Sequence, residues 1–322
     1  MEKSRHEIRQ KLQISLDHLI FEVFANQSPT PFSRNELKQF VLGRAAFPST
    51  LCFAIHAALL NVALNGEIAQ ITTLLKLLKN LTEHDLGSPT EFSITSLSEE
   101  MMHKDDVAVL SSAFADDIGL TTVLVPAPDN EINRATVHIN TALSALKSNA
   151  PVWWQELLLL GNQIYFASSK NTGAGQFGGA AVFDAFGAIL LNPALINDPS
   201  SALMALVHES SHQQMFMFHL NDPILLNDAT AAYASPLRKE PRPMEGIFHA
   251  LWVSARMVVA AEAVINVENP PSWSDQLVQK QSNFTKKLIW HDMLGPVSIA
   301  DCIGGQNFRL CAVFSSPMPA TF

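Results

Sequence analysis

Hydrophobic residues recur at helical spacing through most of the first half of the chain. Over residues 8–24 they return every three or four positions, and a polar, proline-containing segment then ends the pattern. Ser33 and Glu36 have the spacing of a capping box, which predicts the start of another helix. Residues 53–81 are apolar enough for one or two more. We therefore expect residues 1–150 to be mainly helical.

The pattern becomes strand-like in the middle of the chain. Residues 164–168 and 182–191 form two extended stretches, which predict a hairpin. Between them, residues 173–178 have the Gly-x-Gly-x-x-Gly spacing of a dinucleotide-binding loop. That function requires a strand running directly into the glycines and a long helix opening from them. A polar linker at 168–172 precedes the glycines and only a short segment follows, so we expect a loop between strands.

Two long helices are predicted after the strands. Asp198 suits an N-cap and Pro199 suits the first helical turn, and the helix that they open should end near 221–223. A second helix is expected over residues 243–266. An Asn-Pro-Pro linker at 269–271 separates this helix from the rest of the chain.

The predicted fold class is mainly α with a small antiparallel β-sheet (α+β). Its centre is a zincin-like helix that carries the motif described below and packs against the second long helix. We divide the chain into a mainly helical N-terminal region (1–150), a metal-binding catalytic core (151–270) and a C-terminal helical or loop extension packed on that core (271–322).

Composition limits the classes of function. Of the 322 residues, 48% are hydrophobic and the net charge is −9, which disfavours a nucleic-acid partner. Three cysteines without Cys-x-x-Cys spacing indicate reduced thiols in a cytoplasmic protein. The mixed charge of the N-terminus predicts no signal peptide. Polar residues interrupt the apolar run at 247–265, which predicts a core helix and no membrane span.

The clearest chemical signal is the segment His208-Glu209-Ser210-Ser211-His212. Two histidines four residues apart project from one face of a helix, so that both imidazoles can bind one metal ion. Glu209 can then reach a metal-bound water or a neighbouring donor. The surrounding helix is apolar, and a buried histidine there needs a partner. The segment therefore predicts a metal site.

The third ligand is not determined by the motif. A metzincin would continue with Gly and His, but Met215 and Phe218 occupy those positions, and His219 comes one place too late on an expected unbroken helix. On the second helix, Glu245 and His249 share a face, and either could complete the site.

Arg256 continues the face of the second helix that carries Glu245 and His249. A fixed arginine two turns from a metal suggests a carboxylate that must be held beside the ion, which a peptidase does not explain.

The sequence resembles the HExxH-type α-ketoglutarate-dependent peptide β-hydroxylases, which act on ribosomally made precursor peptides. The resemblance covers roughly residues 160–265 and is carried by His208-Glu-Ser-Ser-His212, Ser235-Pro-Leu-Arg238, Arg242-Pro-Met-Glu-Gly246 and His249-Ala-Leu-Trp-Val-Ser-Ala-Arg256. It implies a single non-haem Fe(II), with 2-oxoglutarate and O2 as cosubstrates.

The resemblance also implies roles for the site residues. His208, His212 and His249 would bind the iron, with Glu245 as the alternative third ligand to His249. The residues expected to hold 2-oxoglutarate are Arg256, Arg242, Arg238 and Ser235. Glu209 would orient a ligand or the bound peptide. The helical N-terminal region lies outside the resemblance, and we expect it to recognise the precursor only because it carries no chemical motif of its own.

Two other functions remain open from the sequence. A zinc metallopeptidase would use Glu209 as the general base on a metal-bound water. A metal-binding partner protein without catalytic activity is the third alternative.

Overall fold

The computed structural model describes residues 2–43, 49–84, 91–115, 123–170, 177–220, 224–228, 230–234 and 241–289. Within them the chain is mainly helical, with small mixed sheets. The helices are α1 (Glu2–His18), α2 (Arg34–Leu42), α3 (Thr50–Asn65), α4 (Ile71–His84), α5 (Lys104–Ala115), α6 (Asp129–Asn149), α7 (Pro151–Leu160), α8 (Pro199–Phe218), α9 (Met244–Ile265) and α10 (Ser274–Ile289). The strands are β1 (Ser93–Ser96), β2 (Leu124–Val125), β3 (Gln163–Phe166), β4 (Ser168–Ser169), β5 (Gly179–Ala180) and β6 (Ala188–Leu191).

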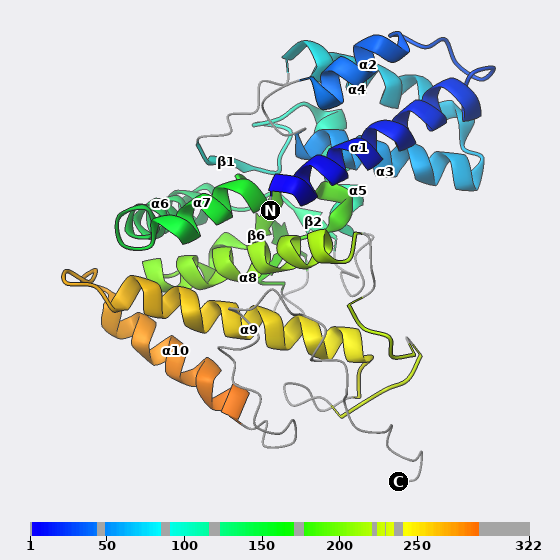
Figure 1. Cartoon of the computed structure of the whole chain (residues 1–322). Coiled ribbons are helices and arrows are strands. Elements are labelled where there is room, and N and C mark those ends of the chain that lie inside the picture. The colour runs from blue at the N-terminus through cyan, green and yellow to red at the C-terminus, as the bar shows by residue number, and fades with distance from the viewer. Residues whose placement is uncertain are drawn as a thin grey trace.

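The N-terminal helices follow the hydrophobic pattern of the sequence. A π-helical turn at Leu19–Val23 continues α1, and the predicted capping box of Ser33 and Glu36 opens α2. The apolar stretch at 53–81 is divided between α3 and α4, with a short 3₁₀ turn at Ile68–Gln70 between them. These helices share one hydrophobic cluster and lie together at the top of Figure 1. The helical prediction for this region is confirmed.

The main sheet has four strands in the order β1-β3-β6-β5. β3 pairs parallel with both β1 and β6, and β5 pairs antiparallel with β6. The main sheet is therefore mixed, and the prediction that 164–168 and 182–191 form an antiparallel hairpin is wrong, whereas β2 and β4 form a separate two-stranded antiparallel sheet. Parallel neighbours need a crossover, and the chain between β3 and β6 provides it. The glycine-rich 171–176 lies outside the described residues.

The extended stretch predicted at 182–191 is shorter than expected. Phe183–Ala185 forms a 3₁₀ turn, and Gly187 has a φ of +91°, a left-handed conformation that glycine adopts without steric cost. Only the residues of β6 continue as a strand, and all four are buried. Both faces of the sheet are covered, because β3 and β6 contribute side chains alternately to two hydrophobic clusters.

Helices α7, α8, α9 and α10 lie one below another in Figure 1, and each packs against the next. Asp198 caps α8 in a capping box with Ser201, and Pro199 occupies its first turn, as predicted. α9 begins after Pro243, also as predicted. α8 therefore lies between the sheet and α9, with α6 beside it in the same hydrophobic cluster.

The division of the chain at residue 150 stays a prediction. β1 and α6, which precede this position, belong to the sheet and to the hydrophobic cluster that support α8. After position 270, Trp273 and Leu277 join the same cluster, and α10 packs on α9. Residues 290–322 lie outside the described part.

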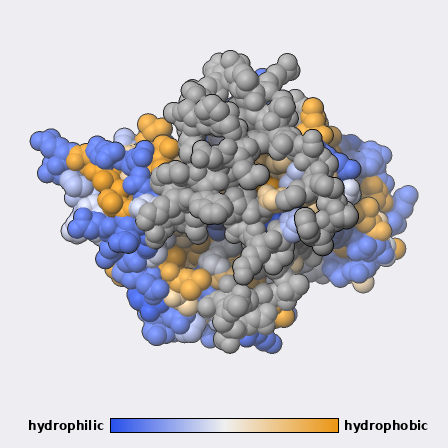
Figure 2. Space-filling model, turned by 90° about the horizontal axis from the view of Figure 1, so that it is seen from below, coloured by the Kyte–Doolittle hydropathy of each residue, from blue (hydrophilic) through white to orange (hydrophobic). Residues whose placement is uncertain are grey.

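Among the described residues, α9 is the one helix long and apolar enough to cross a membrane. It packs between α8 and α10, and 56% of its most apolar window is buried. On the face shown in Figure 2, the described residues at the two sides are mainly hydrophilic, with hydrophobic side chains in small groups. The packing of α9 is that of the core helix predicted from the sequence.

Candidate metal centre

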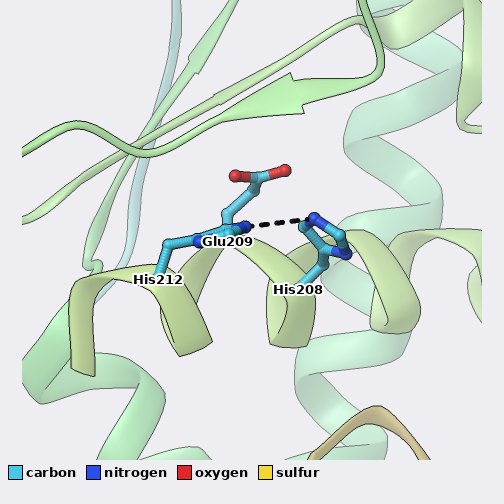
Figure 3. Close-up of side chains that lie close together, drawn as sticks. All are labelled: His208, Glu209 and His212. Atoms are coloured by element: carbon cyan, nitrogen blue, oxygen red, sulfur yellow. Dashed lines mark hydrogen bonds between the residues drawn. The ribbon is translucent and has the colours of Figure 1, made fainter. Parts of the chain in front are cut away.

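The two motif histidines meet on one face of α8. The Nε2 atoms of His208 and His212 are 3.3 Å apart, and their ring centroids are 5.1 Å apart. Figure 3 shows this contact as a dashed line. Two nitrogens that each lie about 2.1 Å from one ion are about 3.0–3.4 Å apart in octahedral or tetrahedral geometry. The pair therefore already has the spacing of two ligands of a single ion.

Burial keeps both imidazoles neutral. It lowers the pKa of His208 to about 4. Burial also lowers the pKa of His212 to about 3, with further contributions from His208 and His249. A histidine binds a metal through a neutral ring nitrogen, so protons do not compete with the ion at neutral pH.

Glu209 is buried beside the pair, with 5% of its surface exposed. One carboxylate oxygen lies within 4.8 Å of a ring nitrogen of His208 and of His212. In Figure 3 the carboxylate points away from the helix. It meets Gly179 of β5, where an added Cβ would lie 2.5 Å from Oε1 of Glu209. The absence of a side chain at position 179 therefore makes room for this carboxylate.

The two candidates for the third ligand belong to a neighbouring group on α9. The ring centroid of His249 is 5.7 Å from that of His212. Nε2 of His249 is 4.0 Å from Oε1 of Glu245, and Nδ1 of His219 is 3.9 Å from the same oxygen. Burial lowers the pKa of His249, and His219 and Arg242 add to this effect while Glu245 opposes it. The structure thus gathers four histidines around the contact of α8 with α9.

His219 has a position that the sequence analysis did not expect. The helix was predicted to continue unbroken to about 221–223, but α8 ends at Phe218, and His219 is its C-cap. There it packs against His249, with ring centroids 5.7 Å apart. Its spacing from the motif excluded it as a metzincin ligand, but the spacing could not predict that His219 would lie against α9.

Arg256 is buried and has protein partners. It forms an ion pair with Glu156 of α7, and its Nε donates a hydrogen bond of 3.0 Å to Ser211 Oγ. Its guanidinium also lies over the ring of Trp153, 4.6 Å from the centroid. Burial lowers the pKa of Arg256, and Glu156 opposes the shift. Nε and one terminal nitrogen of this arginine are therefore already engaged by Ser211 and Glu156.

Arg242 lies just before α9, and its charge adds to the lowering of the His249 pKa. Its backbone pairs with that of Tyr233 in an isolated antiparallel bridge. Its half-buried guanidinium passes over Gly246, where an added Cβ would lie 3.4 Å from Cζ. It forms no ion pair with another described residue. Arg238 and Ser235, the other predicted anion-binding residues, lie outside the described part of the chain.

The donors around His208 and His212 fit a mononuclear transition-metal site. Two neutral imidazoles and one carboxylate are the set that non-haem Fe(II) oxygenases use, and zinc accepts the same donors. The neighbours that shape this site, Glu156 and Gly179, were not predicted from the sequence. Glu156 is a single acid in an apolar helix, which was a usable signal for a buried partner. No local signal pointed to Gly179.

We compared the sequence with known proteins. No protein-family model matches the sequence, and no curated protein matches it significantly.

Proposed function

We propose that this protein is an Fe(II)- and 2-oxoglutarate-dependent oxygenase that hydroxylates a side-chain β-carbon of a ribosomally made precursor peptide. The observation that carries the metal centre is the 3.3 Å separation of the His208 and His212 Nε2 atoms beside the buried carboxylate of Glu209. The choice of cosubstrate and peptide rests on the resemblance of the motif string that includes Arg242 and His249.

The residues of the chain have separate tasks in this proposal. His208 and His212 hold the iron through Nε2, and Glu209 supplies the carboxylate of a two-histidine, one-carboxylate set. When bound, the iron supplies oxygen activation at the cost of oxidising the 2-oxo acid. The sequence instead favoured His249 as the third ligand, with Glu245 as the alternative and Glu209 in an orienting role. His249 lies next to the pair, so it could bind in place of Glu209.

Arg242 is the best placed arginine for the far carboxylate of 2-oxoglutarate. Its charge acts on His249, and it has no carboxylate partner among the described residues, whereas Arg256 is paired with Glu156. A guanidinium can bind a carboxylate through two parallel hydrogen bonds, which fixes the orientation of the cosubstrate.

Anaerobic titration tests the metal and the cosubstrate together. Protein with Fe(II) should develop a charge-transfer absorption band when 2-oxoglutarate is added, and His208→Ala/His212→Ala should not. Arg242→Met should raise the Kd of 2-oxoglutarate about tenfold or more, which corresponds to the loss of one charge-assisted contact, and leave Fe(II) binding unchanged. Absence of the band in the native protein would contradict the proposal.

A zinc metallopeptidase is the second candidate, and the position of Glu209 favours it. A buried carboxylate beside two neutral histidines can act as the base for a metal-bound water. Incubation of the protein with a precursor peptide separates the two functions. A mass gain of one oxygen with Fe(II) and 2-oxoglutarate supports the oxygenase, and cleavage with Zn(II) supports the peptidase.

A further inference from the structure

A second group of metal-binding side chains lies where the end of α8 meets the start of α9. His219, Glu245 and His249 each offer a ligand atom, and these atoms lie within 4.8 Å of one another. They come from elements that are separated in sequence by the connection between the two helices. The group is distinct from His208 and His212, whose ligand atoms gather with Glu209.

The two imidazoles of this group are incompletely satisfied. Nε2 of His219 and Nε2 of His249 are both buried, and neither has a hydrogen-bond partner among the described residues. Both contacts with Oε1 of Glu245, at 3.9 and 4.0 Å, are too long for hydrogen bonds. A buried polar atom without a partner costs free energy, and a bound ion would remove that cost at His249 Nε2. His219 would reach the same ion through Nδ1, the nitrogen nearer Glu245.

A pocket next to the group leaves room for a further donor. It has a volume of 140 Å³ and is lined by His219, Glu245 and Asp228, among others. Asp228 is held in place because its Oδ1 accepts hydrogen bonds from the amide and hydroxyl of Thr230, at 2.8 and 2.7 Å. The side chain of Glu245 is 60% exposed, so an ion can reach the group from solvent.

We propose that His219, Glu245 and His249 bind a second divalent metal ion, such as zinc. Two imidazoles and a carboxylate are donors that zinc accepts, with water or Asp228 completing four-coordination. The two imidazole–carboxylate distances, 3.9 and 4.0 Å, exceed the ~3.4 Å between ligands of a tetrahedral ion by about half an ångström. The ion fastens the end of α8 to the first turns of α9 and thereby fixes the position of His249 beside His212.

Metal stoichiometry tests this proposal with Co(II), whose visible spectrum reports the ligands. Native protein should bind one equivalent more than His219→Ala/Glu245→Gln. The variant His208→Ala/His212→Ala should retain the equivalent at the second site. His103→Ala removes an exposed histidine and serves as the control, with the stoichiometry of the native protein.

Thermal unfolding supplies a readout that does not depend on activity. In the His208→Ala/His212→Ala background, Zn(II) at about a hundred times its Kd should raise Tm by about 4 °C. Adding His219→Ala and Glu245→Gln to that background should abolish the increase.

The outcomes separate this proposal from the proposed function. Two results together would overturn the second site. One is that His219→Ala/Glu245→Gln binds as many ions as the native protein, and the other is that His249→Ala loses the ion held by His208 and His212. His249 would then belong to the first site. Undiminished stoichiometry in His208→Ala/His212→Ala would instead contradict the first metal site and leave the second intact.

Discussion

The buried ion pair of Arg256 and Glu156 indicates that this arginine stabilises the fold, whereas the sequence suggests that it binds the carboxylate of a cosubstrate. Replacing Arg256 with Met leaves the Glu156 carboxylate, whose side chain is 15% exposed, without its counter-ion. Removing one partner of a buried pair costs about 3–5 kcal/mol. With 322 residues the entropy of unfolding is roughly 0.7 kcal/mol/K, so Tm should fall by about 4–7 °C. The hydrogen bond to Ser211 is lost as well, which favours the upper part of this range.

Thermal unfolding followed by circular dichroism measures this effect in a double-variant cycle. Apolar side chains can replace a buried ion pair with little net loss, so Arg256→Met/Glu156→Met should regain most of the stability that Arg256→Met loses. Arg34→Met is the matched control. Arg34 pairs with Asp17 and Glu22, but 52% of its side chain is exposed, so its replacement should lower Tm by less than about 3 °C.

Binding of 2-oxoglutarate to the stable double variant decides the role of Arg256. If the arginine acts through Glu156 and Ser211 to hold α9 against α7 and α8, the double variant binds iron and 2-oxoglutarate like the native protein. The reasoning is refuted if the double variant is no more stable than Arg256→Met. It is also refuted if the folded double variant keeps iron but loses 2-oxoglutarate.

Three further predictions concern the surroundings of α8 and the N-terminal region. Gly179→Ala should displace the Glu209 carboxylate and weaken Fe(II) binding. Gly178→Ala is the control, because its added Cβ would only touch a side chain at 3.8 Å; equal Fe(II) affinities of the two variants in a metal titration would contradict the prediction. Asp198→Ala should cost about 1–2 kcal/mol in urea unfolding, because it removes the N-cap of α8, and Asp198→Asn should recover much of the loss. Burial lowers the pKa of His56 to about 4, so its contribution to stability is present above about pH 6.5 and is lost as pH falls toward 4. His56→Gln should therefore weaken the pH dependence of the unfolding free energy over that interval, and an unchanged dependence would argue against it.

Local signals in the sequence determined the helices that carry the candidate metal-binding residues. Asp198 and Pro199 specified the start of α8 because capping depends on residues within one turn. The four-residue spacing of His208 and His212 placed both imidazoles on one face of the helix, since helical geometry alone decides this. The hydrophobic pattern likewise predicted α9 and its place in the core.

Only the tertiary structure decided how these elements combine. Strand direction in the sheet depends on which strands become neighbours, and the short runs at β3 and β6 are compatible with either direction. The partner of Arg256 is 100 residues away in the sequence, and no local pattern encodes that distance. The close approach of Gly179 to Glu209 and the meeting of His219 with His249 also depend on packing between separate elements. The sequence by itself therefore determined that two histidines can share an ion, and the packing of α8 against β5 and α9 decided which other donors lie within reach.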